Sequence, residues 1–224
     1  MIRISKPIFT VLLGTFICLL ASVCVAQQVV DKMVATVNAG VKTDLITYSD
    51  LLWQLALQPN SQLDNPTSSD LNRALRLLID QRLILQEAEK IPTIVPTQKE
   101  ISDARDELAR NFPSQPEFQN RLLRVGLTSE KLDEIVEQRL KMEKYLDFRF
   151  RNFVVISQKE IADYYTQVYT PRFRERFPGR IVPALEQVRD EIEQNLKEAK
   201  IESETDSFLD TARERAEIVM LNAV

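Results

Sequence analysis

Strand-like patterns of apolar residues occur at the beginning and at the end of the stretch 32–221. Residues 32–38 alternate and lead into a turn at Asn38–Gly40, which predicts a short strand, with a weaker second strand near 41–46. The apolar run 217–221 predicts a terminal strand. Because a lone strand leaves its backbone groups unsatisfied, we expect the two ends to pair in a small sheet.

Helical periodicity fills the space between these strands, and helix-capping patterns recur within it. A Ser or Thr followed three residues later by an acid begins the stretches TYSD, TQKE, SQPE and SQKE. Gly126 has the position of a C-terminal cap. The expected helices cover about 47–56, 68–90, 97–111, 114–125, 128–153, 157–169 and 183–216.

The helix expected at 68–90 is the most apolar of the set. Its polar side chains gather on one narrow face, and apolar residues cover most of the remainder. A helix of this kind is buried on more than one side, so we expect it at the centre of a bundle. The polar face consists of Asn72, Arg73, Arg76, Asp80 and Glu87.

Two further helices define expected packing faces. The helix at 128–153 has a continuous apolar stripe, and Tyr145 and Phe148 fall outside it. The last helix has Pro183 in its first turn, where a missing N–H is tolerated, and would span roughly 50 Å if unbroken to Ala216. The inward stripe at 128–153 is Leu132, Ile135, Val136, Leu140, Met142, Leu146, Phe150 and Phe153. The expected fold is therefore mainly α, a multi-helix core with a small sheet joining N- and C-terminal strands.

The first residues indicate export. Basic residues at 3 and 6 precede an apolar stretch, and small residues before Gln27 fit a signal peptide cut after Ala26, which predicts a periplasmic protein. An uncleaved anchor helix is the alternative, although the apolar part is short for a span. A lipoprotein signal fits less well, because Val23 precedes Cys24.

Composition excludes several classes of chemistry. The chain has no histidine, and both cysteines lie within the signal segment, so Ser-His and Cys-His catalysis and zinc or copper sites are not expected. Four scattered glycines make no phosphate-binding loop. After removal of residues 1–26 the net charge is −6, which disfavours nucleic acid. Carboxylates such as Asp103, Asp106 and Glu107 fit solvated helix faces better than an acid–base pair. We therefore expect that the protein is not an enzyme and that it binds no cofactor or metal.

The order of these segments resembles the SurA- and PrsA-type chaperones. VVDKMVATVNAGVKTDLITYSDL is similar to the family's first strand, turn and helix, and LRLLIDQRLILQEAEK resembles its second helix. IPTIVPTQKEISDARDELARN and FQNRLLRVGLTSEKLDEIVEQRLKMEKYL look like the segments that follow. The resemblance covers 29–169 closely and 183–221 in outline.

In that family a parvulin-type prolyl isomerase domain would follow VISQKEIADYY. Here only TQVYTPRFRERFPGRIV separates this segment from the last helix, and the chain lacks the His and mature Cys of such an active site. The expected organisation is a single helical core, 27–224. It consists of a SurA-like segment at 27–169, a bridge at 170–182 in place of the isomerase, and a return helix and strand at 183–224.

The resemblance implies an ATP-independent periplasmic holdase that binds unfolded outer-membrane or other envelope proteins without isomerase activity. Two alternatives remain: an envelope structural or adaptor protein that docks one defined partner, and a residual prolyl isomerase. The last helix could also be exchanged between two copies in a homodimer.

Aromatic side chains are the candidates for binding such clients, since they supply contact area without demanding one geometry. Each of them could instead complete the core. The basic residues Arg172, Arg174, Arg176 and Arg180 fit a solvated face, or an attraction to acidic clients or anionic lipid headgroups. The candidates are Tyr145, Phe148, Tyr164, Tyr165, Tyr169, Phe173 and Phe177.

Overall fold

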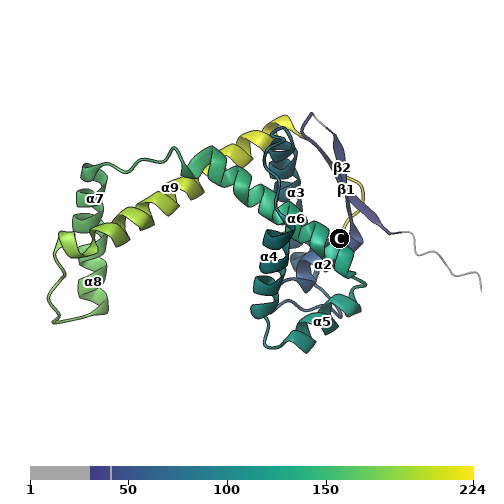
Figure 1. Ribbon diagram of the computed structural model, residues 1–224, viewed down its shortest axis with the longest axis horizontal. Coiled ribbons are helices and arrows are strands. Elements are labelled where there is room, and N and C mark those ends of the chain that lie inside the picture. Colours follow the sequence, from purple (N-terminus) through teal and green to yellow (C-terminus); the bar gives the residue numbers. More distant parts are fainter. Residues whose placement is uncertain (1–30, 41) are drawn as a thin grey trace, which may run out of the picture. The chain divides into compact units, whose positions relative to one another are not determined.

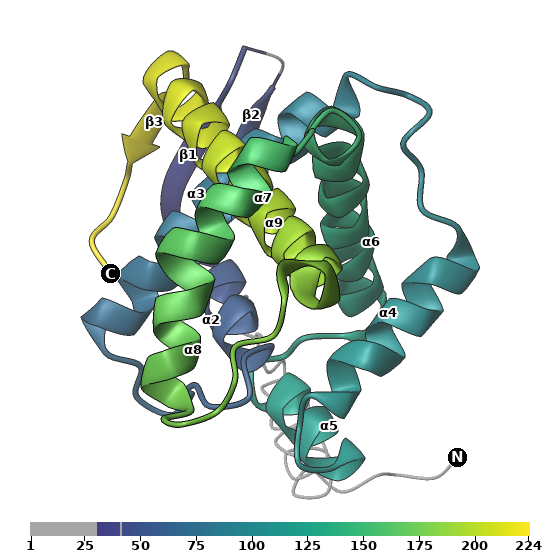
Figure 2. The same cartoon turned by 90° about the vertical axis from the view of Figure 1, so that its left-hand side faces the viewer.

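The two ends of the chain meet in one small antiparallel sheet. In the computed structural model, which describes residues 31–40 and 42–224, strand β1 (Met33–Asn38) lies between β2 (Thr43–Thr47) and β3 (Glu217–Met220). Figure 1 labels β1 and β2, and Figure 2 labels all three strands. Val37 pairs with Asp44 on one side and with Ile218 on the other. The pairing of the first and last strands is confirmed, whereas the predicted signal peptide lies outside the described residues.

Two helices cover the inner face of this sheet. Helix α2 (Tyr48–Ala56) follows β2 directly, because Thr47 caps it in a complete capping box with Asp50. Helix α3 (Ser68–Glu89) contributes to a core with β1 and β2. The fully buried Gln86 side chain joins α3 to the β1–β2 hairpin: it accepts from the Ala39 N–H at 2.9 Å and donates to the Val37 carbonyl at 3.1 Å.

A second core forms where α4 (Gln98–Arg110), α5 (Gln115–Arg124) and α6 (Ser129–Leu146) meet α2. Gly126, with φ of 64°, ends α5. The N–H groups of Gly126 and Leu127 return to the carbonyls of Leu123 and Leu122, which is a Schellman motif. The predicted helix starts at Thr97 and Ser114 and the stop at Gly126 are confirmed.

The segment after α6 departs from the prediction. A π turn, η1 (Asp147–Arg151), ends α6, and after a loop the chain forms α7 (Gln158–Tyr164), a second π turn η2 (Tyr165–Tyr169) and α8 (Thr170–Arg176). Figures 1 and 2 show α7 and α8 in line. The predicted helix end near Tyr169 is therefore wrong. Pro171 lies in the first turn of α8, directly after the π turn, so this proline does not end the helix.

Helix α9 (Leu185–Arg215) is unbroken and packs against two different parts of the chain. Its first half buries Val188 and Ile192 against α7, and its second half buries Leu209 in a cluster with α3 and α6. The predicted start was two residues early, since Pro183 precedes the cap residue Ala184. The mainly α fold with a small sheet that joins N- and C-terminal strands is confirmed.

Candidate functional site

A groove runs beside the second half of α9, between this helix, α3 and η1. One cavity of about 480 Å³ lies between the three elements, and Phe150 and Phe208 line it. A second cavity of about 520 Å³ shares Arg149, Phe150 and Glu204 with the first and extends to Phe153. Each has the volume of a typical ligand pocket. We call the two cavities together the α9 groove. The residues that line it and matter most below are Arg149, Phe150, Phe153, Val155, Glu204 and Phe208.

Aromatic rings in edge-on or tilted contact form the floor of the α9 groove. Phe208 meets Phe150 edge-on, with ring centroids 5.9 Å apart, and Tyr145 at 6.2 Å. The Arg149 guanidinium carbon lies 5.3 Å from the Phe208 centroid and 5.5 Å from that of Phe150. Cations at this distance are attracted to the ring faces. The groove therefore combines an aromatic floor with a cation held over it.

Ion pairs and backbone contacts fix the rim of the groove. Glu87 and Lys90 pair at 2.6 Å on α3. Lys200 of α9 donates to the Val155 carbonyl at 3.3 Å and lies 3.6 Å from a carboxylate oxygen of Glu160. Arg151 joins η1 to α9 through Glu198 at 2.8 Å. These contacts hold the η1–α7 loop against the middle of α9.

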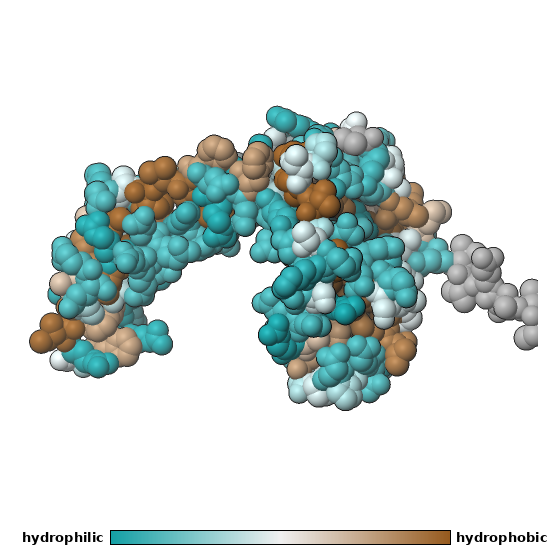
Figure 3. All heavy atoms as spheres, in the orientation of Figure 1, coloured by the Kyte–Doolittle hydropathy of each residue, from teal (hydrophilic) through white to brown (hydrophobic). Residues whose placement is uncertain are grey.

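Exposed apolar side chains concentrate at the same place. Phe148, Phe153 and Val155 are 53%, 73% and 76% exposed. Figure 3 shows hydrophobic residues gathered along the loop that joins η1 to α7. Grouped apolar exposure of this kind is typical of interaction surfaces. Phe148 lies on η1 but not in the groove lining, whereas Phe153 and Val155 line it.

Tyr145 is the one candidate whose predicted position is wrong. It is 3% exposed and packs in the core cluster with Ile84, Leu85 and Leu209. It falls outside the apolar stripe of its own helix because α6 packs against α3, against α4 and, near its end, against Leu209 of α9, so its buried face is wider than one stripe. Burial raises the pKa of the Tyr145 hydroxyl, although Arg149 opposes the shift.

Four of the remaining aromatic candidates, Tyr165, Tyr169, Phe173 and Phe177, form a continuous ladder of ring contacts. Tyr165 and Tyr169 stack with ring centroids 5.9 Å apart, and Tyr169 and Phe173 stack at 6.0 Å, whereas the Phe173 and Phe177 rings are tilted at 5.0 Å. Tyr164, Tyr165 and Tyr169 also pack against Val188 and Ile192 of α9, so their rings are half-buried. The ladder and the α9 groove belong to different apolar clusters.

Sequence reasoning missed the residues that line the groove. Phe150 and Phe153 are expected on the inward stripe, but Phe153 is among the most exposed of the large apolar residues described. The stripe ends one turn earlier, because the cap at Ser157 requires a non-helical link before it. That cap was a usable signal that Phe153 and Val155 lie on a loop.

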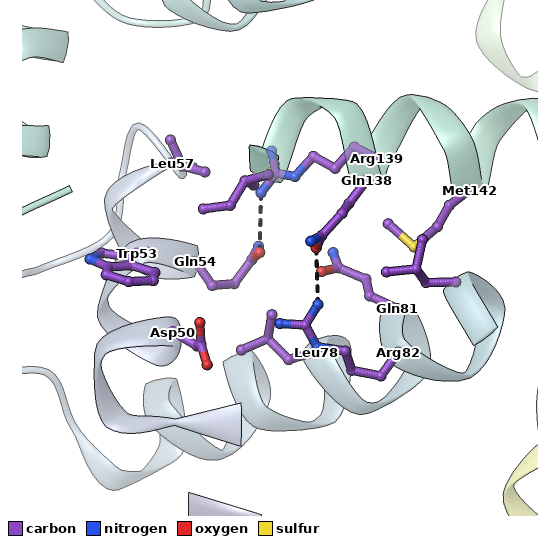
Figure 4. Close-up of a pocket in the computed structure, with 12 residues that line it drawn as sticks. Asp50, Trp53, Gln54, Leu57, Leu78, Gln81, Arg82, Gln138, Arg139 and Met142 are labelled. Carbon is purple, nitrogen blue, oxygen red and sulfur yellow. Dashed lines mark hydrogen bonds between the residues drawn. The ribbon is translucent and has the colours of Figure 1, made fainter. Parts of the chain in front are cut away.

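A separate cavity inside the helical core is too small for a ligand. It measures about 30 Å³ between α2, α3 and α6, which is room for a water-sized molecule. Figure 4 shows its two interhelical hydrogen bonds: Arg82 donates to Gln138 at 2.9 Å and Arg139 to Gln54 at 3.1 Å. This cavity serves helix packing.

No protein-family model matches the chain, and no curated protein matches it. Among the described residues, none of the helices combines the length and apolar character of a membrane span, and no His, Cys, Asp or Glu side chains group as metal ligands.

Proposed function

We propose that this protein is an ATP-independent periplasmic holdase that binds unfolded segments of outer-membrane or other envelope proteins, without prolyl isomerase activity. The observation that carries the proposal is the α9 groove with Phe153 and Val155 exposed at its edge. The sequence resemblance to SurA-type chaperones supports the same conclusion.

The chemistry of the groove suits clients of varied sequence. Aromatic rings supply contact area with few rotatable bonds, and the cation over them accommodates acidic or aromatic client side chains. Lys90, Arg215, Glu87 and Glu204 place both signs of charge around the groove. A surface of this kind favours modest affinity spread over many contacts, which permits release without ATP.

The test is suppression of aggregation, measured by light scattering for two unrelated clients, an unfolded outer-membrane barrel protein and a heat-unfolded soluble enzyme. We expect suppression of both without ATP. In the double variant Phe153→Ser/Val155→Ser each lost side chain removes about 1 kcal/mol of apolar burial, so client affinity should fall about thirtyfold.

The matched control is Leu123→Ser. Leu123 is 75% exposed on α5, which does not line the groove, so its loss removes one exposed apolar side chain elsewhere and should leave client affinity unchanged. Client affinity equal to that of the unaltered protein in the double variant would contradict the assignment of the groove. A peptide isomerisation assay should show no rate above background.

An adaptor that docks one defined partner remains the second candidate, and one observation favours it. Met33, Leu45 and Val219 on the outer face of the sheet are 52%, 41% and 41% exposed. Leu45 and Val219 flank Thr36 in register, so the exposed side chains are neighbours. Binding of a single folded partner, with no effect on either unfolded client, would favour the adaptor.

A further inference from the structure

The end of α8 and the turn after it carry a cluster of cations that the chain itself does not neutralise. Among the described residues, Arg172, Arg174, Arg176 and Arg180 have no ion-pair partner, while neighbouring cations such as Lys159 are paired. Within 170–182 the only acid is Glu175. This local excess of positive charge contrasts with the net charge of −4 for the whole chain.

A tight turn after α8 holds two of these arginines next to the same aromatic ring. Pro178 and Gly179, the latter with φ of 81°, occupy the two central positions of a turn closed by the Arg180 N–H on the Phe177 carbonyl at 3.2 Å. The turn brings Arg180 back toward the helix. The guanidinium carbons of Arg176 and Arg180 both lie 5.5 Å from the centroid of the Phe177 ring.

The same turn exposes an apolar tip. Ile181 is 93% exposed, the largest exposure of any large apolar side chain described. Figure 3 shows an apolar group at the turn that follows α8. On α8 the Phe173–Phe177 ridge lies between Arg172 and Arg176 on one side and Arg174 on the other, since residues four apart share a helix face.

We propose that α8 and the following turn dock on the anionic phospholipid surface of a membrane. Guanidinium groups pair with phosphate oxygens through two parallel hydrogen bonds. Contacts with the Phe177 ring hold two of the four arginines, Arg176 and Arg180, in place. An exposed apolar tip beside cations fits a headgroup interface, where charge meets phosphate and Ile181 enters the acyl boundary. An acidic protein surface would use the cations and leave Ile181 in water.

The test is flotation with vesicles of neutral phosphatidylcholine or of the same lipid mixed with phosphatidylglycerol. The protein used is the exported form, with its N-terminus identified by mass spectrometry. We expect binding to the anionic vesicles alone, weakening as salt is raised. Each arginine near such a surface changes the partition about fivefold, so Arg172→Gln/Arg174→Gln should reduce binding about 25-fold. This pair leaves the stack on Phe177 intact.

Two further variants sharpen the result. Ile181→Ser should weaken vesicle binding while leaving aggregation suppression unchanged, which separates this surface from the α9 groove. Arg76→Gln/Arg110→Gln makes the same charge change on exposed positions of α3 and α4 and should bind as the unaltered protein does. The proposal would be overturned by equal binding to neutral and anionic vesicles, or by unchanged vesicle binding in both Arg172→Gln/Arg174→Gln and Ile181→Ser. It would also be overturned if soluble polyglutamate competed for binding and Ile181→Ser had no effect.

Discussion

At the residue scale, a buried arginine holds the end of α2. Arg121 of α5 donates to the carbonyls of Ala56 at 3.0 Å, Leu55 at 3.1 Å, Gln58 at 2.8 Å and Ser61 at 2.9 Å. These carbonyls lie at and beyond the helix C-terminus, where a cation is favoured. Burial lowers the pKa of Arg121 without removing its charge.

Arg121→Met should lower the free energy of unfolding by about 3 kcal/mol, because it leaves several carbonyls without donors. Urea denaturation measures the change. The control is Arg124→Met: this half-exposed arginine pairs with the exposed Asp64, so the loss should stay below about 1 kcal/mol. Equal losses in the two variants would show that the carbonyl contacts of Arg121 contribute little.

A second residue makes stability depend on pH. The hydrogen bond from Lys144, with those from the Thr97 N–H and hydroxyl, lowers the pKa of Glu100 from 4.5 to about 2. The ionised form is favoured in the folded state, so this stabilisation is complete above pH 4.5 and is lost as the pH falls toward 2.

Glu100→Gln should therefore be less stable than the unaltered protein above pH 5, and the two should converge near pH 2. Denaturation midpoints measured at several pH values test this expectation. Lys144→Gln, which removes the largest cause of the shift, should flatten the same pH dependence in part. A constant difference between Glu100→Gln and the unaltered protein across the range would contradict the linkage.

Residue-scale prediction from sequence was good where partners are local. Thr47, Thr97 and Ser157 cap their helices as expected, because each hydrogen bond closes within three residues. Arg121 and Gln86 were not recognised, since their partners lie 42 to 66 residues away. Their roles follow from which elements meet.

At the element scale, α9 packs at two separate places. Ile192, fully buried, lies in the cluster with Ile161 and Val188, while Leu209 lies in the cluster with α3 and α6. No residue of α9 between Ile192 and Leu209 is buried. The two packed ends can therefore differ in local stability.

Ile192→Ala should cost about 2–4 kcal/mol, felt first in the cluster around α7. We expect faster amide hydrogen exchange in α7 and the first half of α9, with α3 unchanged. Leu209→Ala is the counterpart and should act on the α3 end instead. A uniform loss of protection in Ile192→Ala would mean that α9 couples both clusters into one cooperative unit.

The ends of helices could be predicted where the chain carries capping residues. They could not be predicted at the junctions where one helix continues into the next. Gly126 and the capping residues mark true ends. Pro171 looked like part of a non-helical bridge, yet the helix continues through η2 and α8 to Arg176. The bridge at 170–182 is therefore helical in its first half and a loop in its second.

At the scale of the whole molecule, the sheet closes the chain. β1 and β3 are separated by almost the full described length, and Thr36 and Val219 are cross-strand partners on the exposed face. Helix α9 leads directly into β3. A cross-link between Thr36 and Val219 therefore reports whether β1 pairs with the β3 of its own chain or with that of a second copy.

Thr36→Cys/Val219→Cys should form a disulfide within one chain, because cross-strand neighbours lie within disulfide reach. A background in which Cys18 and Cys24 are replaced by Ser removes competing thiols. Non-reducing electrophoresis then distinguishes a cross-linked monomer from a covalent dimer. The single Thr36→Cys variant is the control, and a dimer specific to the double variant would indicate exchange of α9 and β3.

The strands, the capped helix starts, the stop at Gly126 and the pairing of the two ends could all be predicted from the amino-acid sequence. These follow from contacts within a few residues, or from strands that have few other partners. Which aromatic rings are covered depends instead on how the helices pack against one another. Tyr145 is buried and Phe153 exposed because α6 packs against α3, α4 and α9 and ends in a π turn, and contacts between distant segments set both facts.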